Sequence, residues 1–339
     1  MSRRNVRITK ASGEKVPFSE EKLRNSLERS GATETQIERV VDEVEDHLYE
    51  GITTGKIYRR AYQLLRKRSR SNAARYKLKK AIMELGPSGY PFERFVGAIL
   101  EQQGFRTEVG VLVEGKCVIH EIDVMAWKNS KLIMVECKFH NRPGVKCDVK
   151  VPLYIHSRFR DVVLARNSNG IQIDNDGKSL KDSAGHDGPG GQDVHDDSEG
   201  STGSEGHDGP DGDGSKDLPD FLGSDYFREY EGWIVTNTRF TDDAISYGTC
   251  TGLVMTGWDF PGKNSLKHRI GLAGLHPLTC LSSLNRKEKE FLLENGIVLC
   301  RTVPEEKSLL RELGLSDTRI AKVERECDEL VNELDVPHE

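Results

Sequence analysis

Three neighbouring segments in the middle of the chain have strand-like patterns of apolar residues. They span 106–115, 117–127 and 131–139, with short polar turns between them. Short apolar segments bounded by such turns are typical of β-strands. Apolar residues recur every three or four positions in 91–105, before the strands, and in 153–164, after them, which is the spacing of an amphipathic helix. The pattern predicts an α/β unit with the order helix, strand, strand, strand, helix.

The two ends of the chain are predicted to be mainly helical. Residues 1–87 start with a short strand pattern and continue with helical spacing. Ser19 is a good N-cap there, and Gly31 and Gly51 are expected to end the first two helices. Residues 262–339 also have mostly helical spacing. We expect a mainly helical N-terminal module and a small helical C-terminal region.

A polar stretch divides the middle region. Residues 167–222 are rich in Gly, Asp and Ser, contain GHDGP twice and hold few apolar residues. A segment of this composition cannot offset its ordering entropy, and we predict it to be disordered. Strand, helix and strand patterns resume in 231–258. We therefore predict one domain over 88–261, with a central mixed sheet and an acidic insertion, and an α+β or α/β fold class.

The net charge of the chain hides a basic folded part. Residues 167–222 carry fourteen acidic and three basic side chains, so a chain of net charge −6 holds +5 elsewhere. Between Gly51 and Met83 there are eleven basic residues and no acidic one. Such a stretch attracts the phosphates of a nucleotide or of a nucleic acid. A merely solvated helix face is the alternative.

The cysteines and the hydropathy pattern indicate a compartment. The chain has seven cysteines, an odd number without a CxxC pair, which favours reduced thiols and a cytoplasmic location. No apolar run approaches the length of a membrane-spanning helix, so we expect no membrane contact.

Charged residues interrupt the second and third predicted strands. If Asn129 and Ser130 form a two-residue hairpin turn, opposed residues have numbers that add up to 259. Asp123 then faces Glu136, with Cβ atoms about 5 Å apart on one face of the sheet. Lys138 lies on the same face because side chains alternate along a strand. The register therefore brings two carboxylates and an ammonium group together.

Two close carboxylates repel each other unless a positive charge lies between them. Mg²⁺ prefers oxygen ligands and keeps several water molecules, and it can activate one of them and stabilise charge on a phosphate. The three hairpin residues thus suit the hydrolysis of a phosphodiester bond. The alternative is an exposed ion pair between the lysine and a carboxylate, which would have little energetic value.

The order of these elements resembles the PD-(D/E)xK nuclease superfamily and, within it, the Mrr-type restriction endonuclease domain. The resemblance covers about residues 88–260 and uses Glu93 in the first helix, Asp123, and Glu136-Cys137-Lys138. Ile122 stands where the name of the superfamily has proline.

The resemblance implies a role for each matched residue. Asp123 and Glu136 would be metal ligands, together with the carbonyl of Cys137. Lys138 would be catalytic, and Glu93 would support the metal or its water. Glu121 and His140 flank the site and would assist, with a plain surface position as the alternative for His140. Helical spacing after the hairpin groups three more side chains, which would contact DNA phosphate or belong to an ordinary amphipathic helix: Lys150, Tyr154 and Arg158.

The N-terminal module resembles the ATP-cone, a nucleotide-sensing module, over about residues 3–85. The match rests on the segment VRITKASGEKVPFSEEKLRNSL, in which a short strand and a glycine turn precede the start of a helix, and on the later segment GITTGKIY. The resemblance implies that ATP or dATP binds as a regulatory signal. The residues that it places at the nucleotide are Lys10, Gly13, Lys22, Leu23 and Thr54.

These patterns lead us to expect a Mg²⁺-dependent endodeoxyribonuclease that adenine nucleotide regulates. DNA and the nucleotide are the expected partners, and a homodimer is left open because nucleases that cut both strands often pair. One alternative is a nucleotide-responsive DNA-binding regulator whose nuclease fold is inactive. Another is an RNA-processing nuclease, since the same core serves both nucleic acids.

Overall fold

The structure is a computed structural model that describes residues 6–10, 12–142, 144–167, 227 and 229–332. The predicted acidic insertion, 167–222, lies outside the described residues except for its first one.

The N-terminal region is a small antiparallel hairpin followed by four helices. These elements are β1 (Arg7–Thr9), β2 (Lys15–Pro17), α1 (Glu20–Glu28), α2 (Glu34–Glu45), α3 (Thr54–Arg66) and α4 (Arg70–Met83). The Ser19 hydroxyl caps α1 by accepting the Lys22 N–H, as predicted. The expectation that Gly51 ends the second helix is wrong, because α2 stops at Glu45 and a turn follows.

A five-stranded mixed sheet forms the centre of the molecule. Its order is β3-β4-β5-β7-β9, with the first two pairings antiparallel and the last two parallel. A separate two-stranded parallel ladder joins β6 to β8. The elements of this region are α5 (Tyr90–Gln102), β3 (Arg106–Glu114), β4 (Ile119–Lys128), β5 (Lys131–Lys138), β6 (Lys146–Cys147), α6 (Lys150–Asn167), β7 (Glu229–Thr236), β8 (Arg239–Phe240), α7 (Asp242–Cys250) and β9 (Val254–Thr256).

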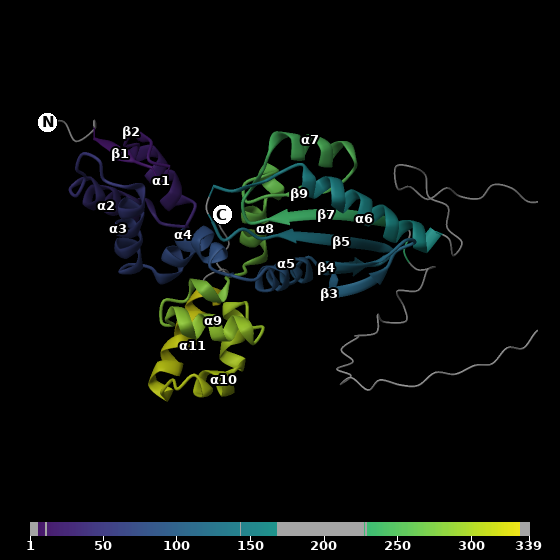
Figure 1. Cartoon of the computed structure of the whole chain (residues 1–339). Coiled ribbons are helices and arrows are strands. Elements are labelled where there is room, and N and C mark those ends of the chain that lie inside the picture. The colour runs from purple at the N-terminus through teal and green to yellow at the C-terminus, as the bar shows by residue number, and fades with distance from the viewer. Residues whose placement is uncertain (1–5, 11, 143, 168–226, 228, 333–339) are drawn as a thin grey trace, which may run out of the picture.

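Helices cover both faces of this sheet, because both faces of its central strands are apolar (Figure 1). Ile133 and Val135 of β5 share a core with α5 residues such as Phe92. Leu132 and Met134, one position along, share another core with α6 residues such as Val162. The alternation predicted for this strand is confirmed, and it decides which helix each side chain faces.

The C-terminal region consists of short helices. They are the 3₁₀ helices η3 (Gly262–Asn264), η4 (Leu278–Cys280) and η5 (Cys300–Glu305), and the α-helices α8 (Leu266–Ala273), α9 (Arg286–Glu294), α10 (Lys307–Glu312) and α11 (Asp317–Asn332). The whole architecture is mixed α+β, with a helical N-terminal region, a central mixed sheet and C-terminal helices. The predicted fold class is therefore confirmed.

Helix α4 belongs to two hydrophobic cores. Ala73 packs in the core of the N-terminal region with residues such as Leu27 and Val40. Ala81 and Ile82 pack in the larger core, which also contains most of the buried apolar residues of the C-terminal region. The N-terminal and C-terminal regions are therefore joined through this helix.

Candidate functional site

The predicted hairpin register is confirmed. Strands β4 and β5 pair antiparallel from Lys128 opposite Lys131 to Val124 opposite Val135, and Asn129 in the turn has a left-handed φ of 52°. The ladder ends there. The Asp123 carboxylate, at the next position, accepts the N–H of Cys137 at 2.6 Å in place of a backbone carbonyl.

The β3–β4 pairing is interrupted opposite Asp123. The pairs pass from Val109 opposite Val124 to Val111 opposite Ile122, with the same register on both sides. Gly110, between them, has a φ of +69°, a conformation that side-chain-bearing residues rarely adopt. The break in the pairing thus coincides with the left-handed conformation of this glycine.

Two side chains of α6 hold the Glu136 carboxylate. The Tyr154 hydroxyl donates to Oε1 at 3.1 Å, and the Arg158 guanidinium donates to Oε2 at 2.7 Å. The same guanidinium nitrogen donates to the carbonyl of Glu121 at 3.2 Å. In this structure Tyr154 and Arg158 therefore position a site carboxylate. The hydrogen bond that the structure shows for Lys150 is from its backbone N–H to Asp148.

The carboxylates of this site perturb one another. Burial, followed by the nearby charge of Glu136, raises the pKa of Asp123 to about 6, although the Cys137 N–H and Arg158 oppose the shift. Burial and the charges of Asp123, Glu121 and Glu136 raise the pKa of Glu93 to about 7. Glu93, predicted from the first helix, therefore lies close enough to Asp123 and Glu136 for their charges to raise its pKa. A cation would relieve this repulsion.

Lys138 ends β5, and the end of β7 fixes the backbone there. The Thr236 hydroxyl donates to the Lys138 carbonyl at 2.7 Å. The Asn237 side chain accepts the His140 N–H and donates to the His140 carbonyl, both at 2.8 Å. His140 is half-buried, and burial lowers its pKa. Thr236 and Asn237 lie in the segment VTNTRFTDDAISYG, which resembles the next strand and helix of the same nuclease family, but that resemblance does not indicate which residues they contact.

The backbone of Cys137 faces the gap between β4 and β5. Its N–H points to Asp123, and the N–H and C=O of one strand residue point to the same side. The carbonyl predicted as a third ligand therefore opens toward the site. Among the described residues, no group of three or more His, Cys, Asp and Glu forms a metal-binding cluster. The available donor set is thus two carboxylates and a carbonyl.

The N-terminal hairpin lies beside the start of α3. Thr9 bridges to Thr53, directly before Thr54, and the Thr9 N–H donates to the Ile52 carbonyl at 2.9 Å. Gly13 turns the hairpin with a φ of +85°. Lys10, predicted at the nucleotide, therefore lies near the N-terminus of α3, whose N–H groups suit an anion.

The other predicted nucleotide residues have clear structural environments. The Lys10 ammonium is exposed and pairs with Glu14 at 2.8 Å. Lys22 is exposed in the first turn of α1, and Leu23 is a core residue that is 6% exposed. Leu23 would therefore act by fixing α1.

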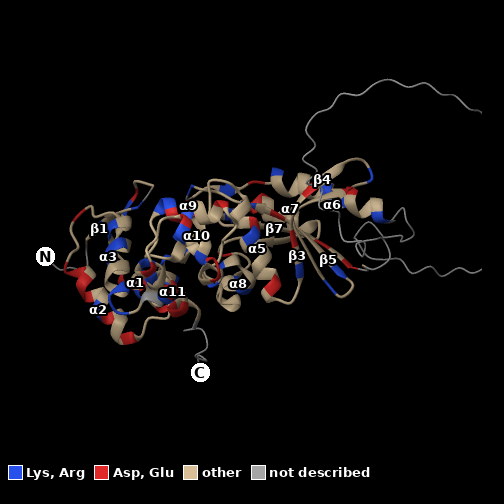
Figure 2. Cartoon of the chain, turned by 90° about the horizontal axis from the view of Figure 1, so that it is seen from below, with Lys and Arg blue, Asp and Glu red and all other residues tan. Residues whose placement is uncertain are grey.

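Many basic residues of the Gly51–Met83 stretch have internal partners. Arg60 and Arg68 pair with Glu43 of α2, and basic positions of α3 lie beside acidic positions of α2 in Figure 2. Lys77 and Lys80 pair with Glu84. The two carboxylates of Glu43 and Glu84 thus balance only a small part of this positive charge.

Comparison with protein families identifies the N-terminal region. Residues 6–82 match the family described as ATP cone domain, and residues 276–331 match the one described as AF1548-like, C-terminal. The chain therefore has an N-terminal ATP cone domain, as predicted, and this supports nucleotide binding. The two matches leave the central sheet between them, so its nuclease resemblance stays a prediction.

Two similar proteins cover most of the chain. An uncharacterized protein of Archaeoglobus fulgidus is 29% identical over 236 residues, which are 69% of this chain and 98% of that protein. The crystal structure of AF1548, a protein of unknown function, has 27% identity and a TM-score of 0.47, and covers 73% of this chain and all of that one. Neither description states an activity.

In the described ranges, no helix is long and apolar enough to cross a membrane. The seven cysteines are free thiols.

Proposed function

We propose that this protein is a Mg²⁺-dependent endonuclease that hydrolyses phosphodiester bonds of DNA, and that adenine nucleotide bound to its ATP cone domain regulates it. The observation that carries the proposal is the proximity of the Asp123 and Glu136 carboxylates just beyond the last β4–β5 pair, with Lys138 at the end of β5 and Glu93 close to the two acids. A cytoplasmic location, supported by the free thiols, is part of the proposal.

The donor set fits a hard cation that keeps most of its water. Mg²⁺ is usually held by one or two protein carboxylates plus waters, so the lack of a third acidic ligand is compatible with it. Asp123 and Glu136 would hold the ion with the carbonyl of Cys137. The bound ion would supply an activated water and stabilise negative charge on the phosphate.

The remaining residues would act on the substrate and on the ligands. Lys138 places an ammonium group on the same face of β5 as Glu136, where it can neutralise charge that develops on the scissile phosphate. Glu93 would orient the attacking water. Tyr154 and Arg158 keep the Glu136 carboxylate in one orientation, and such preorganisation limits the loss of rate from misplaced groups.

A non-cleaving DNA-binding regulator is the second candidate. Both oxygens of Glu136 already accept hydrogen bonds from α6. This observation favours a site in which Glu136 no longer binds a metal.

The deciding experiment incubates the purified protein with plasmid DNA and with structured RNA, with Mg²⁺ or with a chelator, and with or without ATP. We expect Mg²⁺-dependent nicking of DNA that Asp123→Asn and Lys138→Ala remove. Arg160→Ala, at an exposed position of α6, is the control that keeps activity. Inactivity of the wild type on every substrate, together with DNA binding, would establish the regulator instead.

A calorimetric titration tests the nucleotide half of the proposal. ATP or dATP should bind to the wild type, and Lys10→Ala combined with Lys22→Ala should weaken binding. Sedimentation of the protein with and without DNA would show whether two copies pair on the substrate. Absence of nucleotide binding would refute the regulatory part and leave the nuclease part to its own test.

A further inference from the structure

The buried side chain of Asn237 holds the backbone that follows Lys138 through hydrogen bonds. Asn237 is 0% exposed and lies directly after β7. Its amide binds both the N–H and the C=O of His140 at 2.8 Å. It thus continues, with side-chain atoms, the β5–β7 pairing whose last pair is Lys138 opposite Thr236.

The same side chain contacts the end of helix α4. The Asn237 Nδ2 group also donates to the Met83 sulfur at 3.2 Å, and Met83 is the last residue of α4. A second contact lies nearby, because a Cβ on Gly86 would overlap the ring of Phe139. Phe139 therefore packs against the chain just after α4, and His140 is linked to Met83 through the Asn237 side chain.

Helix α4 also contacts the other helices of the ATP cone domain. The Tyr76 ring stacks on Tyr58 of α3 with centroids 4.9 Å apart. The Asn72 amide donates to the Gly31 carbonyl at 3.1 Å and to Gln36 of α2 at 3.2 Å. A change in the packing of α2 and α3 would therefore reach α4 directly.

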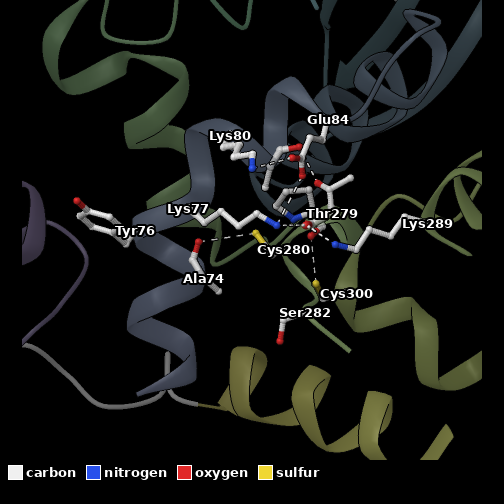
Figure 3. Close-up of polar contacts among 12 residues, drawn as sticks. Ala74, Tyr76, Lys77, Lys80, Glu84, Thr279, Cys280, Ser282, Lys289 and Cys300 are labelled. Carbon is white, nitrogen blue, oxygen red and sulfur yellow. Dashed lines mark hydrogen bonds and ion pairs between the residues drawn. The ribbon is translucent and has the colours of Figure 1, made fainter. Parts of the chain in front are cut away.

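The C-terminal region holds the middle of α4 (Figure 3). The Thr279 hydroxyl donates to the Ala81 carbonyl at 2.6 Å. Lys77 of α4 and Lys289 of α9 both donate to the Thr279 carbonyl, at 3.2 and 3.1 Å. Helix α4 therefore contacts the ATP cone domain, the C-terminal region and Asn237, which makes it the physical connection between the three.

We propose that Asn237 is a positioning residue through which α4 links the ATP cone domain to the Lys138 end of the candidate site. Nucleotide binding orders the ATP cone domain and the end of α4. The Met83–Asn237 contact then stabilises the hydrogen bonds of Asn237 to His140, and these fix the backbone after Lys138. This inference rests on the proposed function, since it specifies how the nucleotide acts on the site.

The test measures amide hydrogen exchange of the full chain with and without ATP, at concentrations for which calorimetry shows saturation. The His140 amide reports directly on the Asn237 contact. We expect ATP to slow its exchange about threefold, which corresponds to a modest increase in local stability. The Val118 amide, which donates to Asp161 directly before β4, is the internal reference and should not respond.

Two variants distinguish a role of Asn237 in positioning the Lys138 end of the site from a purely structural role. Met83→Leu keeps the size of the side chain but removes the sulfur acceptor, so it should bind ATP and lose the effect of ATP on His140. Asn237→Ala should expose the His140 amide in both states, and Asn264→Ala, at an exposed position, should behave as the wild type. In DNA cleavage, Met83→Leu should lose the ATP response of kcat and leave KM unchanged.

The possible failures are distinguishable. If ATP binds and the His140 exchange is unchanged or faster, or if Met83→Leu responds as the wild type does, this inference is overturned and the nuclease proposal stands. If ATP does not bind at all, the regulatory half of the proposed function fails and the inference fails with it.

Discussion

Acidic side chains in the C-terminal region and at the central sheet have opposite electrostatic environments. Glu326 of α11 is 6% exposed and accepts hydrogen bonds from the Ser282 N–H and hydroxyl and from the Ser283 N–H, at 2.5–2.8 Å. Burial opposes its charge, but these donors outweigh it and lower the pKa. At the central sheet, burial and neighbouring acids raise the pKa values of Asp123 and Glu93.

The difference lies in what the fold supplies to each carboxylate. Glu326 receives donors and joins α11 to the segment before α9, so its charge stabilises the protein. Asp123 receives one N–H and a neighbouring acid, so its charge costs stability. A cost of this kind is common where a site is kept for a ligand, because activity and stability make different demands.

The largest expected effect is that of Asp123→Asn on DNA cleavage. The substitution keeps the size of the side chain and an oxygen for the Cys137 N–H, but it removes a metal ligand's charge. On the proposed function, we expect the rate of plasmid nicking to fall by about 10²–10³-fold, as for the loss of one stabilising group in other enzymes.

The same variant should be at least as stable as the wild type. Because it removes repulsion between acids, its free energy of unfolding in chelator should be unchanged or higher by about 1 kcal/mol. Asp328→Asn, exposed on α11, should change neither the cleavage rate nor the urea midpoint. A clear loss of stability in Asp123→Asn would contradict the comparison drawn above.

Glu326→Gln should show the reverse behaviour. Its amide nitrogen would face the donors of Ser282 and Ser283, so we expect the free energy of unfolding to fall by about 2–3 kcal/mol, measured by urea denaturation. Cleavage by the folded fraction should not change. Glu312→Gln, an exposed substitution on α10, serves as the control.

The stability difference at Glu326 should depend on pH. Its pKa is lowered in the folded protein from a usual value of 4.5, so its contribution is complete above that pH and is lost as the pH falls through the folded pKa. The difference between wild type and Glu326→Gln should therefore shrink below about pH 4. A difference that stayed constant down to pH 3 would assign the effect to packing.

Arg158→Lys should reduce cleavage by about tenfold, because a lysine cannot bind Glu136 and the Glu121 carbonyl together as the planar guanidinium does. The positive charge at position 158 is kept, so the substitution tests whether the orientation of the Glu136 carboxylate affects the rate. Arg160→Lys, two residues away and exposed, is the matched control. Equal rates for the two variants would show that Arg158 does not position the carboxylate.

Tyr154→Phe should have the smallest effect. It removes one neutral hydrogen bond to Glu136 and no charge, so we expect a three- to fivefold lower rate, about 1 kcal/mol. Single-turnover cleavage at saturating Mg²⁺ would measure it. A loss as large as that of Asp123→Asn would indicate that the hydroxyl contacts the substrate.

The sequence was sufficient for features with a local cause. The hairpin register followed from a two-residue turn and the period of a strand, and the contacts of Asp123 and Glu136 fit it. The start of α1 followed from Ser19. Gly51 does adopt a positive φ, but its N–H binds the Arg7 carbonyl, a partner far along the chain, so it shapes a turn and does not end α2.

Features that depend on distant segments could not be predicted in this way. Helical spacing grouped Tyr154 with Arg158, but their target depends on which face of the sheet α6 covers. Asn237 binds His140 across 97 positions of sequence. No periodicity or short motif records such a contact, because it exists only after β5 and β7 have paired.

Helix α4 limits how far the chain can be treated as separable modules. The family match ends at residue 82, yet Ala81, Ile82 and Leu85 lie in the core that also contains the C-terminal helices. A cut at the family boundary would expose apolar surface on the remaining part, and we expect aggregation of such a fragment. An ATP cone domain that shares its last helix with the core of the C-terminal region cannot be replaced as an independent domain. A chimera that keeps this domain would also need the surface of the C-terminal region that binds α4.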